Sequence, residues 1–336
     1  MNASLRDNTP SSQLVDTHGR TITYLRLSIT DRCNLRCRYC MPENGVEVMD
    51  HSEILSYEEL LRISHIFVKL GVNKIRITGG EPFARKNCYD FMQRLMAQTP
   101  DLDLRITTNG VAVLPYLSRL KKLGIQGMNL SLDTLNRERF KEISRRDCFD
   151  KVRAVFDEAL RIGIPLKVNS VVQENTTDQE LIEMTSLAKE NHIQIRFIEL
   201  MPFSGKDNSN AKVTLSLEER LFMLFPNMKE RVSLQIETAR KFTIDGYRGS
   251  FGIIEGESRK FCKQCNKVRL TSSGMLKNCL YDSGVLDLRE LLRSDASDVE
   301  ITKRIQESVM GKLSDGHETA KLQNKQCEDS MATIGG

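Results

Sequence analysis

Three cysteines that lie close together in the sequence, Cys33, Cys37 and Cys40, have a spacing that suits an iron–sulfur cluster. Such clusters are usually held by four cysteine thiolates. No fourth cysteine lies nearby, so a cluster held by these three would keep one iron open for a ligand. A structural zinc site is the alternative, although it normally has four protein ligands, and the next histidine is His51. The spacing favours a cluster and leaves zinc open.

A second group in the C-terminal part comprises Cys262, Cys265 and Cys279. Thirteen residues separate Cys265 from Cys279, and the segment Ser272–Gly274 between them is typical of a turn. A hairpin around this turn would bring Cys279 back beside the pair. Three thiols would again leave one iron open, and a zinc site completed by a histidine is again the alternative.

The elements that must position these cysteines alternate between strands and helices. Strands are expected at residues 25–30, 74–78, 102–107, 127–132, 166–172 and 193–199. Amphipathic helices are expected at residues 57–70, 89–98, 113–123, 151–162 and 179–190. Six strand–helix units predict a parallel sheet with right-handed crossovers, short of the eight units of a closed barrel. The predicted fold class is α/β, an open partial (β/α)6 TIM-like barrel with a smaller C-terminal cluster-binding region.

Ligands of parallel α/β folds gather at the carboxyl ends of the strands. Polar residues of this chain fall at those positions. They are Asp31 and Arg32 after the first strand, Gly79–Glu81 after the second, Thr108–Gly110 after the third and Asp133 after the fourth.

Four segments are expected along the chain: a polar N-terminal segment at 1–20, the barrel at 21–203, a region with the second cysteine group at 204–313, and a polar tail at 314–336 that ends in Gly-Gly. The third segment contains helical patterns near residues 217–225, 286–293 and 299–311. Composition alone predicts that the tail is disordered.

Composition restricts the class of protein. The net charge is +4, from 49 basic and 45 acidic residues, which is too small an excess to indicate a nucleic-acid-binding protein. No apolar run is long enough to cross a membrane, and the first 20 residues lack the apolar stretch of a secretion signal. A cytoplasmic protein is therefore expected. Disulfides are rare there, so the isolated Cys88, Cys148 and Cys327 are interpreted as bystanders.

The cysteine motifs resemble those of a known superfamily. The segment from Cys33 to Cys40, with the aromatic Tyr39 before the third cysteine, resembles the signature of the radical S-adenosylmethionine superfamily, and residues 79–82 match its GGEP motif. Together with the second cysteine group and the terminal Gly335-Gly336, the chain looks like the GTP 3′,8-cyclase family of molybdenum cofactor biosynthesis. Further phrases that resemble this family lie at residues 76–82, 107–110, 129–133 and 198–202.

The resemblance implies two [4Fe–4S] clusters and S-adenosylmethionine as cofactors. A 5′-deoxyadenosyl radical would remove the 3′ hydrogen of GTP, and the carbon radical would attack C8 of guanine. The product would be (8S)-3′,8-cyclo-7,8-dihydroguanosine 5′-triphosphate, in the first step of molybdopterin biosynthesis. The implied partners are GTP, an electron donor and the downstream cyclic pyranopterin monophosphate synthase. No nucleic acid or membrane is implied, and a homodimer is left open.

The resemblance also implies contacts for individual residues. The S-adenosylmethionine site would be lined by Tyr39, Gly80, Ser131 and Met201. The GTP site would be lined by Arg26, Arg76, Thr107, Lys167, Arg196, Lys267 and Arg269. Physical chemistry supports the arginines, because a charge within an inner strand requires a partner and guanidinium groups match phosphate oxygens. The family has an arginine where this chain has Lys267, and lysine keeps the charge without the planar fork.

The tail carries a further hypothesis. Gly335 and Gly336 end the chain as in the family, and glycines can approach a bound ligand closely. The tail is therefore expected to enter the barrel and assist catalysis by positioning GTP. Two rival hypotheses are a radical enzyme that modifies a peptide or another small molecule, and a zinc-binding adaptor without catalytic activity.

Overall fold

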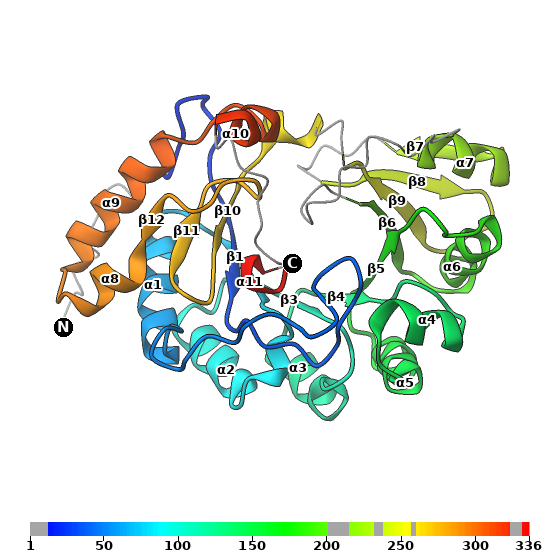
Figure 1. Ribbon diagram of the computed structural model, residues 1–336, viewed down its shortest axis with the longest axis horizontal. Helices are drawn as coiled ribbons and strands as arrows, with labels where there is room; N and C mark the ends of the chain where they lie inside the picture. The colour runs from blue at the N-terminus through cyan, green and yellow to red at the C-terminus, as the bar shows by residue number, and fades with distance from the viewer. Residues whose placement is uncertain (1–12, 201–214, 232–237, 257–259, 323–330, 336) are drawn as a thin grey trace, which may run out of the picture.

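One curved sheet organises the computed structural model of the chain, which describes residues 13–200, 215–231, 238–256, 260–322 and 331–335. Within these residues, twelve strands form a single sheet in the order β12-β11-β10-β1-β2-β3-β4-β5-β6-β9-β8-β7. Its parallel centre comprises β1 (Tyr24–Ser28), β2 (Lys74–Thr78), β3 (Asp103–Thr108), β4 (Gly127–Ser131), β5 (Leu166–Val172) and β6 (Gln194–Glu199). Figure 1 shows that the sheet curls around helix α11 (Met331–Ile334) without closing, which confirms the predicted open partial barrel.

Strands from the C-terminal third extend this sheet at both edges. Beside β1 lie β10 (Lys267–Leu270), which is parallel to it, and then the antiparallel β11 (Met275–Lys277) and β12 (Leu286–Asp287). Beside β6 lie the parallel β9 (Ser250–Ile254) and then the antiparallel β8 (Arg240–Ile244) and β7 (Met228–Arg231). The second cysteine group is therefore carried by strands of the barrel sheet itself.

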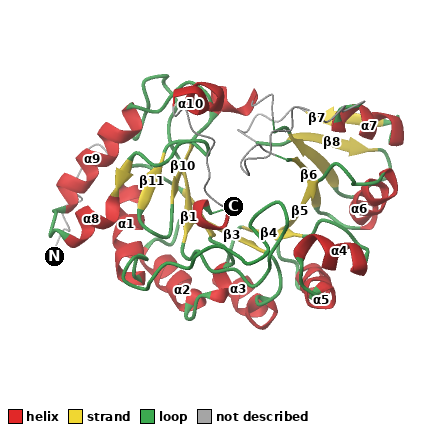
Figure 2. Ribbon diagram, viewed as in Figure 1, coloured by secondary structure: helices red, strands yellow, loops and turns green. Residues whose placement is uncertain are grey.

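Helices cover the outer, convex side of the sheet, as Figure 2 shows. Those of the strand–helix repeat are α1 (Tyr57–Lys69), α2 (Cys88–Gln98), α3 (Leu117–Leu123), α4 (Arg137–Ser144), α5 (Phe149–Arg161) and α6 (Asp178–Glu190). The later helices are α7 (Leu217–Leu224), α8 (Leu288–Arg293), α9 (Asp298–Met310), α10 (Gly316–Leu322) and α11 (Met331–Ile334). Capping boxes at Ser56 and Thr177 satisfy backbone donors where α1 and α6 begin.

The strands alternate between an apolar outer face and a polar inner face. In β1, Leu25 and Leu27 are fully buried on the outer face. On the inner face, β1 carries Tyr24, Arg26 and Ser28. Strands of a parallel sheet are usually apolar on both faces because both are buried in protein. The polar inner face is therefore suited to a polar ligand.

Most predicted elements are confirmed, and four differ in detail. The expected helix at 113–123 is a 3-10 turn, Leu114–Tyr116, followed by α3. The expected helix at 286–293 begins as β12 and continues as α8. Helix α4, which follows the Asn136 cap, was not predicted. The expectation of a disordered tail is wrong for residues 316–322 and 331–334, which are helical. No helix within the described ranges has the length and apolarity that a membrane span requires.

Candidate active site

The parallel pairing of β10 with β1 determines where the two cysteine groups lie. Cys33 follows the carboxyl end of β1, whereas Cys265 precedes the amino end of β10. Strand β11 runs antiparallel to β10 and leads to Cys279 at that same end. The two groups therefore lie at opposite ends of one sheet. The five residues of β1 separate them, a length of about 15 Å for extended backbone.

The first cysteine group brings its thiols together in a half-buried loop. Burial raises the pKa of Cys37 well above its ordinary value, and nearby negative charges raise it further, namely those of Asp133, Cys40 and Cys33. Asn109, which follows β3, donates a hydrogen bond from Nδ2 to the Cys33 sulfur at 3.6 Å. The loop thus holds three thiols whose charges interact directly.

The GGEP motif packs against the backbone segment that leads from β1 into this loop. The backbone N–H of Gly80 donates to the Thr30 carbonyl at 2.8 Å, and a Cβ on Gly80 would collide with the carbonyl of Arg32. Glu81 is fully buried and accepts hydrogen bonds from Thr108 Oγ1 at 2.8 Å and the Asn109 backbone N–H at 2.6 Å. Burial raises the pKa of Glu81 to about 7. Gly80 therefore permits close packing of the backbone that leads into the cysteine loop.

Tyr39 connects the first cysteine loop to the opposite strands. Its hydroxyl donates to Asp133 Oδ2 at 3.0 Å, and Asp133 Oδ1 accepts from the Val171 N–H at 2.8 Å. Burial raises the pKa of Tyr39 well above its ordinary value and that of Asp133 to about 6. The tyrosine before the third cysteine is thus held by a buried carboxyl group beyond β4.

The second cysteine group is assembled by the predicted hairpin. Gly274 has a φ of +90° in the turn between β10 and β11, and the return strand delivers Cys279. Burial raises the pKa of Cys262, and the charges of Cys279 and Cys265 contribute to this rise. Asp282 Oδ2 accepts a hydrogen bond from the Cys279 N–H at 2.6 Å. The three thiols therefore lie within electrostatic range of one another.

Between the two cysteine groups, the inner face is strongly cationic. Arg26 in β1 lies in register with Arg76 in β2 and with Arg269 in β10. Burial and then the charge of Arg269 are the largest causes that lower the pKa of Arg26 to about 9. Arg26 Nε is buried and, among the described residues, has no hydrogen-bond partner. A buried guanidinium without an anion is costly, so this face is suited to an anionic ligand.

Tyr24 lies at the centre of these cations and was not predicted as a site residue. Its hydroxyl accepts a hydrogen bond from Arg76 Nε at 2.6 Å, and the ammonium groups of Lys74 and Lys267 lie 5.5 and 5.7 Å from its ring centroid. Burial raises the pKa of Tyr24, but Arg76, Arg26 and Lys267 outweigh this effect and lower it to about 8. The hydroxyl can therefore interact with a charged group of a ligand.

The opposite strands add polar groups to the same cavity. Thr107, Asn129 and Lys167 lie in register across β3, β4 and β5, and so do Ser131, Asn169 and Arg196 across β4, β5 and β6. Thr107 Oγ1 and Asn169 Oδ1 are buried and have no partner in the described part of the chain. Arg196 Nε donates to Gln194 Oε1 at 3.0 Å. The structure thus brings the predicted residues of β3 to β6 to one surface, and adds Asn129 and Asn169.

The described end of the tail lies inside the barrel, as Figure 1 shows for α11. Ile334 is buried, and the carbonyl of Gly335 accepts a hydrogen bond from Arg269 Nη1 at 3.0 Å. Gly335 has a φ of +86°, and a Cβ there would lie 2.8 Å from Ser28 Cβ and from Thr78 Oγ1. Both of those residues are on the inner face, so the tail reaches the cationic surface.

Two predicted site residues, Met201 and Gly336, lie outside the described residues. The sequence placed Glu81 and Asp133 directly after predicted strands, but it assigned neither residue a role. Tyr24 and Asn169 gave a weaker signal, which was the alternation of polar residues within apolar strands. That pattern could have identified them as inward-facing.

Two families match successive parts of the chain. Residues 27–188 match the family described as Radical SAM superfamily. Residues 193–318 match the family described as Molybdenum Cofactor Synthesis C.

Curated relatives align over most of the chain. The mitochondrial GTP 3′,8-cyclase of Arabidopsis thaliana is 40% identical over 92% of this chain and 80% of its own length. The GTP 3′,8-cyclase of Desulforamulus reducens is 37% identical over 96% of this chain and 100% of its own length. Molybdenum cofactor biosynthesis protein 1 of Bos taurus is 40% identical, and the chain spans 48% of that longer protein.

Solved structures share the fold. Streptococcus suis SuiB bound to S-adenosylmethionine has a TM-score of 0.61 at 17% identity, over 84% of this chain and 68% of SuiB. The protein anSMEcpe with bound S-adenosylmethionine has a TM-score of 0.59 at 15% identity, over 93% of this chain and 88% of that chain. The fold and the cysteine loop define a radical S-adenosylmethionine protein. Within that class, the chain belongs to the GTP 3′,8-cyclase family.

The residues present fit the cofactors of this class. The chemistry of the first cysteine group, three interacting thiols beside the GGEP support, suits an iron–sulfur cluster with one open iron. Within the described residues, no three Cys, His, Asp or Glu side chains are arranged to hold a single metal ion. Thiolates that bind different irons of one cluster need not converge on a single ion, so this finding concerns single-ion sites.

Replacing Gly80 by alanine should disturb the first cysteine loop. The added Cβ would meet the Arg32 backbone, and overpacking of this kind costs about 1–3 kcal/mol. In a chain that also carries Cys262→Ala, Cys265→Ala and Cys279→Ala, we expect Gly80→Ala to reduce iron and sulfide content after anaerobic reconstitution. Gly311→Ala, where the nearest atom is the Ser308 carbonyl at 3.3 Å, is the control. Full iron content in Gly80→Ala would show that the loop tolerates the change.

Tyr24 should titrate with a pKa of about 8 in the cluster-free protein, because the surrounding cations stabilise its phenolate. Ultraviolet absorbance of tyrosinate, followed against pH, measures this step. Tyr24→Phe should remove it, whereas Tyr57→Phe should not, since burial raises the pKa of Tyr57. Addition of GTP should raise the pKa of Tyr24 because phosphate charges offset the cations. A titration that is identical in wild type and Tyr24→Phe would contradict this assignment.

Proposed function

We propose that the chain is a GTP 3′,8-cyclase that uses S-adenosylmethionine to join C3′ of the ribose of GTP to C8 of its guanine. The observation that carries the proposal is the cationic inner face between two cysteine groups. A nucleotide bound along β1 would have its triphosphate among arginines and an end near each group. Membership of the GTP 3′,8-cyclase family supports the same substrate.

The cationic residues of this face bind the triphosphate in the proposed complex. A triphosphate carries about four negative charges at neutral pH, and guanidinium groups bind phosphate oxygens in pairs. Arg26, Arg76 and Arg269 lie side by side on neighbouring strands and match that requirement. Thr107, Lys167, Arg196 and Lys267 complete the proposed GTP site.

The proposed cofactors are two [4Fe–4S] clusters, held by Cys33, Cys37 and Cys40 and by Cys262, Cys265 and Cys279, together with S-adenosylmethionine. When bound, they supply a 5′-deoxyadenosyl radical through one-electron reductive cleavage. Tyr39, Gly80, Ser131 and Met201 are the proposed contacts of S-adenosylmethionine. The second cluster is proposed to bind the guanine ring.

The proposed reaction has two further partners. It requires an electron donor, and its product passes to a cyclic pyranopterin monophosphate synthase. We also propose a cytoplasmic location and the division into a barrel at 21–203 and a cluster-binding region at 204–313. Association as a homodimer can be tested by sedimentation of the reconstituted protein.

Anaerobic incubation with GTP, S-adenosylmethionine and a strong reductant tests the activity directly. We expect 5′-deoxyadenosine and a cyclised nucleotide in equal amounts. The combined change of Cys33, Cys37 and Cys40 to alanine should abolish both products while the second cluster still assembles. The matched change of Cys262, Cys265 and Cys279 should weaken GTP binding and abolish cyclisation, with uncoupled 5′-deoxyadenosine formation retained. Unchanged GTP affinity in the latter variant would argue against purine binding at the second cluster.

Deleting Gly335 and Gly336 should suppress cyclisation without loss of either cluster. The Gly335 carbonyl accepts from Arg269 and the residue packs against Ser28 and Thr78. The deletion would therefore remove a support of the substrate, and small errors in reactive geometry can reduce the rate about 100-fold. Product formation and iron content are measured in parallel. A normal rate in the truncated enzyme would show that the tail is inert.

A further inference from the structure

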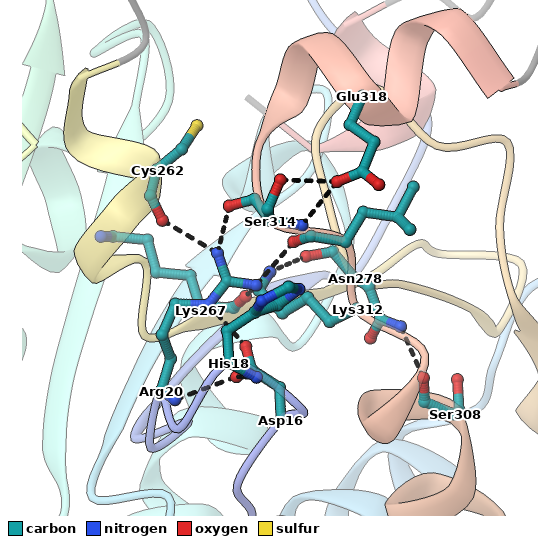
Figure 3. A network of polar contacts seen from close by, with 11 residues as sticks. Asp16, His18, Arg20, Cys262, Lys267, Asn278, Ser308, Lys312, Ser314 and Glu318 are labelled. Atoms are coloured by element: carbon teal, nitrogen blue, oxygen red, sulfur yellow. Dashed lines mark hydrogen bonds and ion pairs between the residues drawn. The ribbon is translucent and has the colours of Figure 1, made fainter.

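A buried lysine near the second cysteine group has no role in the site described above. Lys312 follows α9, and only 4% of its surface is exposed. Its ammonium group donates hydrogen bonds to the carbonyl oxygens of Lys267, at 3.1 Å, and of Asn278 (Figure 3). Lys267 begins β10 and Asn278 immediately precedes Cys279. The ammonium group therefore lies between the two chain segments that deliver Cys265 and Cys279.

Lys312 differs from the neighbouring buried cation. Arg20 is 8% exposed, and its Nε donates to Asp16 Oδ2 at 2.6 Å, so that its charge is balanced. Its remaining donors bind carbonyls, including that of Cys262 at 3.0 Å. For Lys312, by contrast, both hydrogen bonds within the described chain go to neutral carbonyl oxygens, and no carboxylate there forms an ion pair with it.

An unbalanced buried ammonium is costly unless an anion completes its surroundings. The anionic groups that this place can supply are the carboxyl group of Asp282, which interacts electrostatically with Lys312 without an ion pair between them, and the thiolates of the second cysteine group. The two carbonyl groups that hold the ammonium group belong to Lys267, two residues after Cys265, and to Asn278, directly before Cys279. The positive charge is therefore fixed beside the backbone of both cysteines.

We propose that Lys312 is a positioning residue of the second cluster: it ties together the two segments that carry Cys265 and Cys279, and its buried positive charge balances the cluster and sets its reduction potential. The inference rests on the second cluster of the proposed function. Loss of this charge disfavours addition of an electron to the cluster, so the potential moves to more negative values.

The test uses the full-length chain with Cys33, Cys37 and Cys40 changed to alanine, so that only the second cluster remains. Lys312→Met and Lys312→Gln remove the charge, and the glutamine keeps a hydrogen-bond donor. Lys312→Arg keeps the charge. A potentiometric titration followed by electron paramagnetic resonance measures the midpoint potential of each reconstituted variant. Lys303→Met on the exposed face of α9 is the matched control.

We expect both neutral variants to shift the potential negatively by about 59 mV, which is a tenfold change for one electron. Lys312→Arg and Lys303→Met should stay near the parent value. If the neutral variants lose the cluster, retention in Lys312→Arg supports the inference, and loss in all three Lys312 variants overturns it. An unmoved potential in Lys312→Met at full iron content also overturns it, as does an arginine variant that shifts equally. If the parent chain binds no iron, the proposed second cluster fails and this inference fails with it.

Discussion

Mutual repulsion among cations inside the barrel is the constraint on which the rest of the structure depends. Arg26, Arg76 and Arg269 come from three adjacent strands and occupy one register level. Burial and then Arg269 lower the pKa of Arg26, which shows that each charge disfavours the next. Such a group is stable only if anions or acceptors compensate it. Tyr24 and backbone carbonyls supply part of the compensation, and the proposed anionic substrate would supply the remainder.

The fold isolates these charges from the hydrophobic core. Each central strand sends its apolar side chains outward, where Leu27, Ile77 and Ile106 are fully buried beneath the helices. Its polar side chains turn inward. Because the side-chain period of a strand is two, a register shift of one residue would exchange the faces and place arginines in the core. The apolar outer layer therefore fixes the register that aligns Arg26 with its neighbours, and folding and substrate binding depend on the same alternation.

Periodicity and short-range spacing predicted most of the barrel, because each strand and helix is specified locally. The two cysteine groups could also be predicted from the sequence, since Cys33 to Cys40 lie within one loop and Cys262 to Cys279 lie within one hairpin. Pairing of β10 with β1 was not predictable, because it joins segments far apart in sequence and depends on the whole sheet. Tyr24 and Lys312 were missed for the same reason. A tyrosine in a strand or a lysine after a helix is ordinary until the fold surrounds it with cations or carbonyls.

The two ends of the inner face hold different ionisable groups. At the carboxyl end of the strands, near the first cysteine group, burial raises the pKa values of the carboxyl groups of Glu81 and Asp133. At the other end, the charges of Lys312, Lys267 and Arg20 act on Cys265, and the carboxyl group of Asp282 accepts a hydrogen bond from the Cys279 N–H. A sulfonium cofactor is favoured beside carboxylates, and a polyanionic nucleotide is favoured among cations. The distribution of these groups along β1 therefore supports the proposed placement of S-adenosylmethionine at the carboxyl end of the strand and of GTP along its cationic inner face.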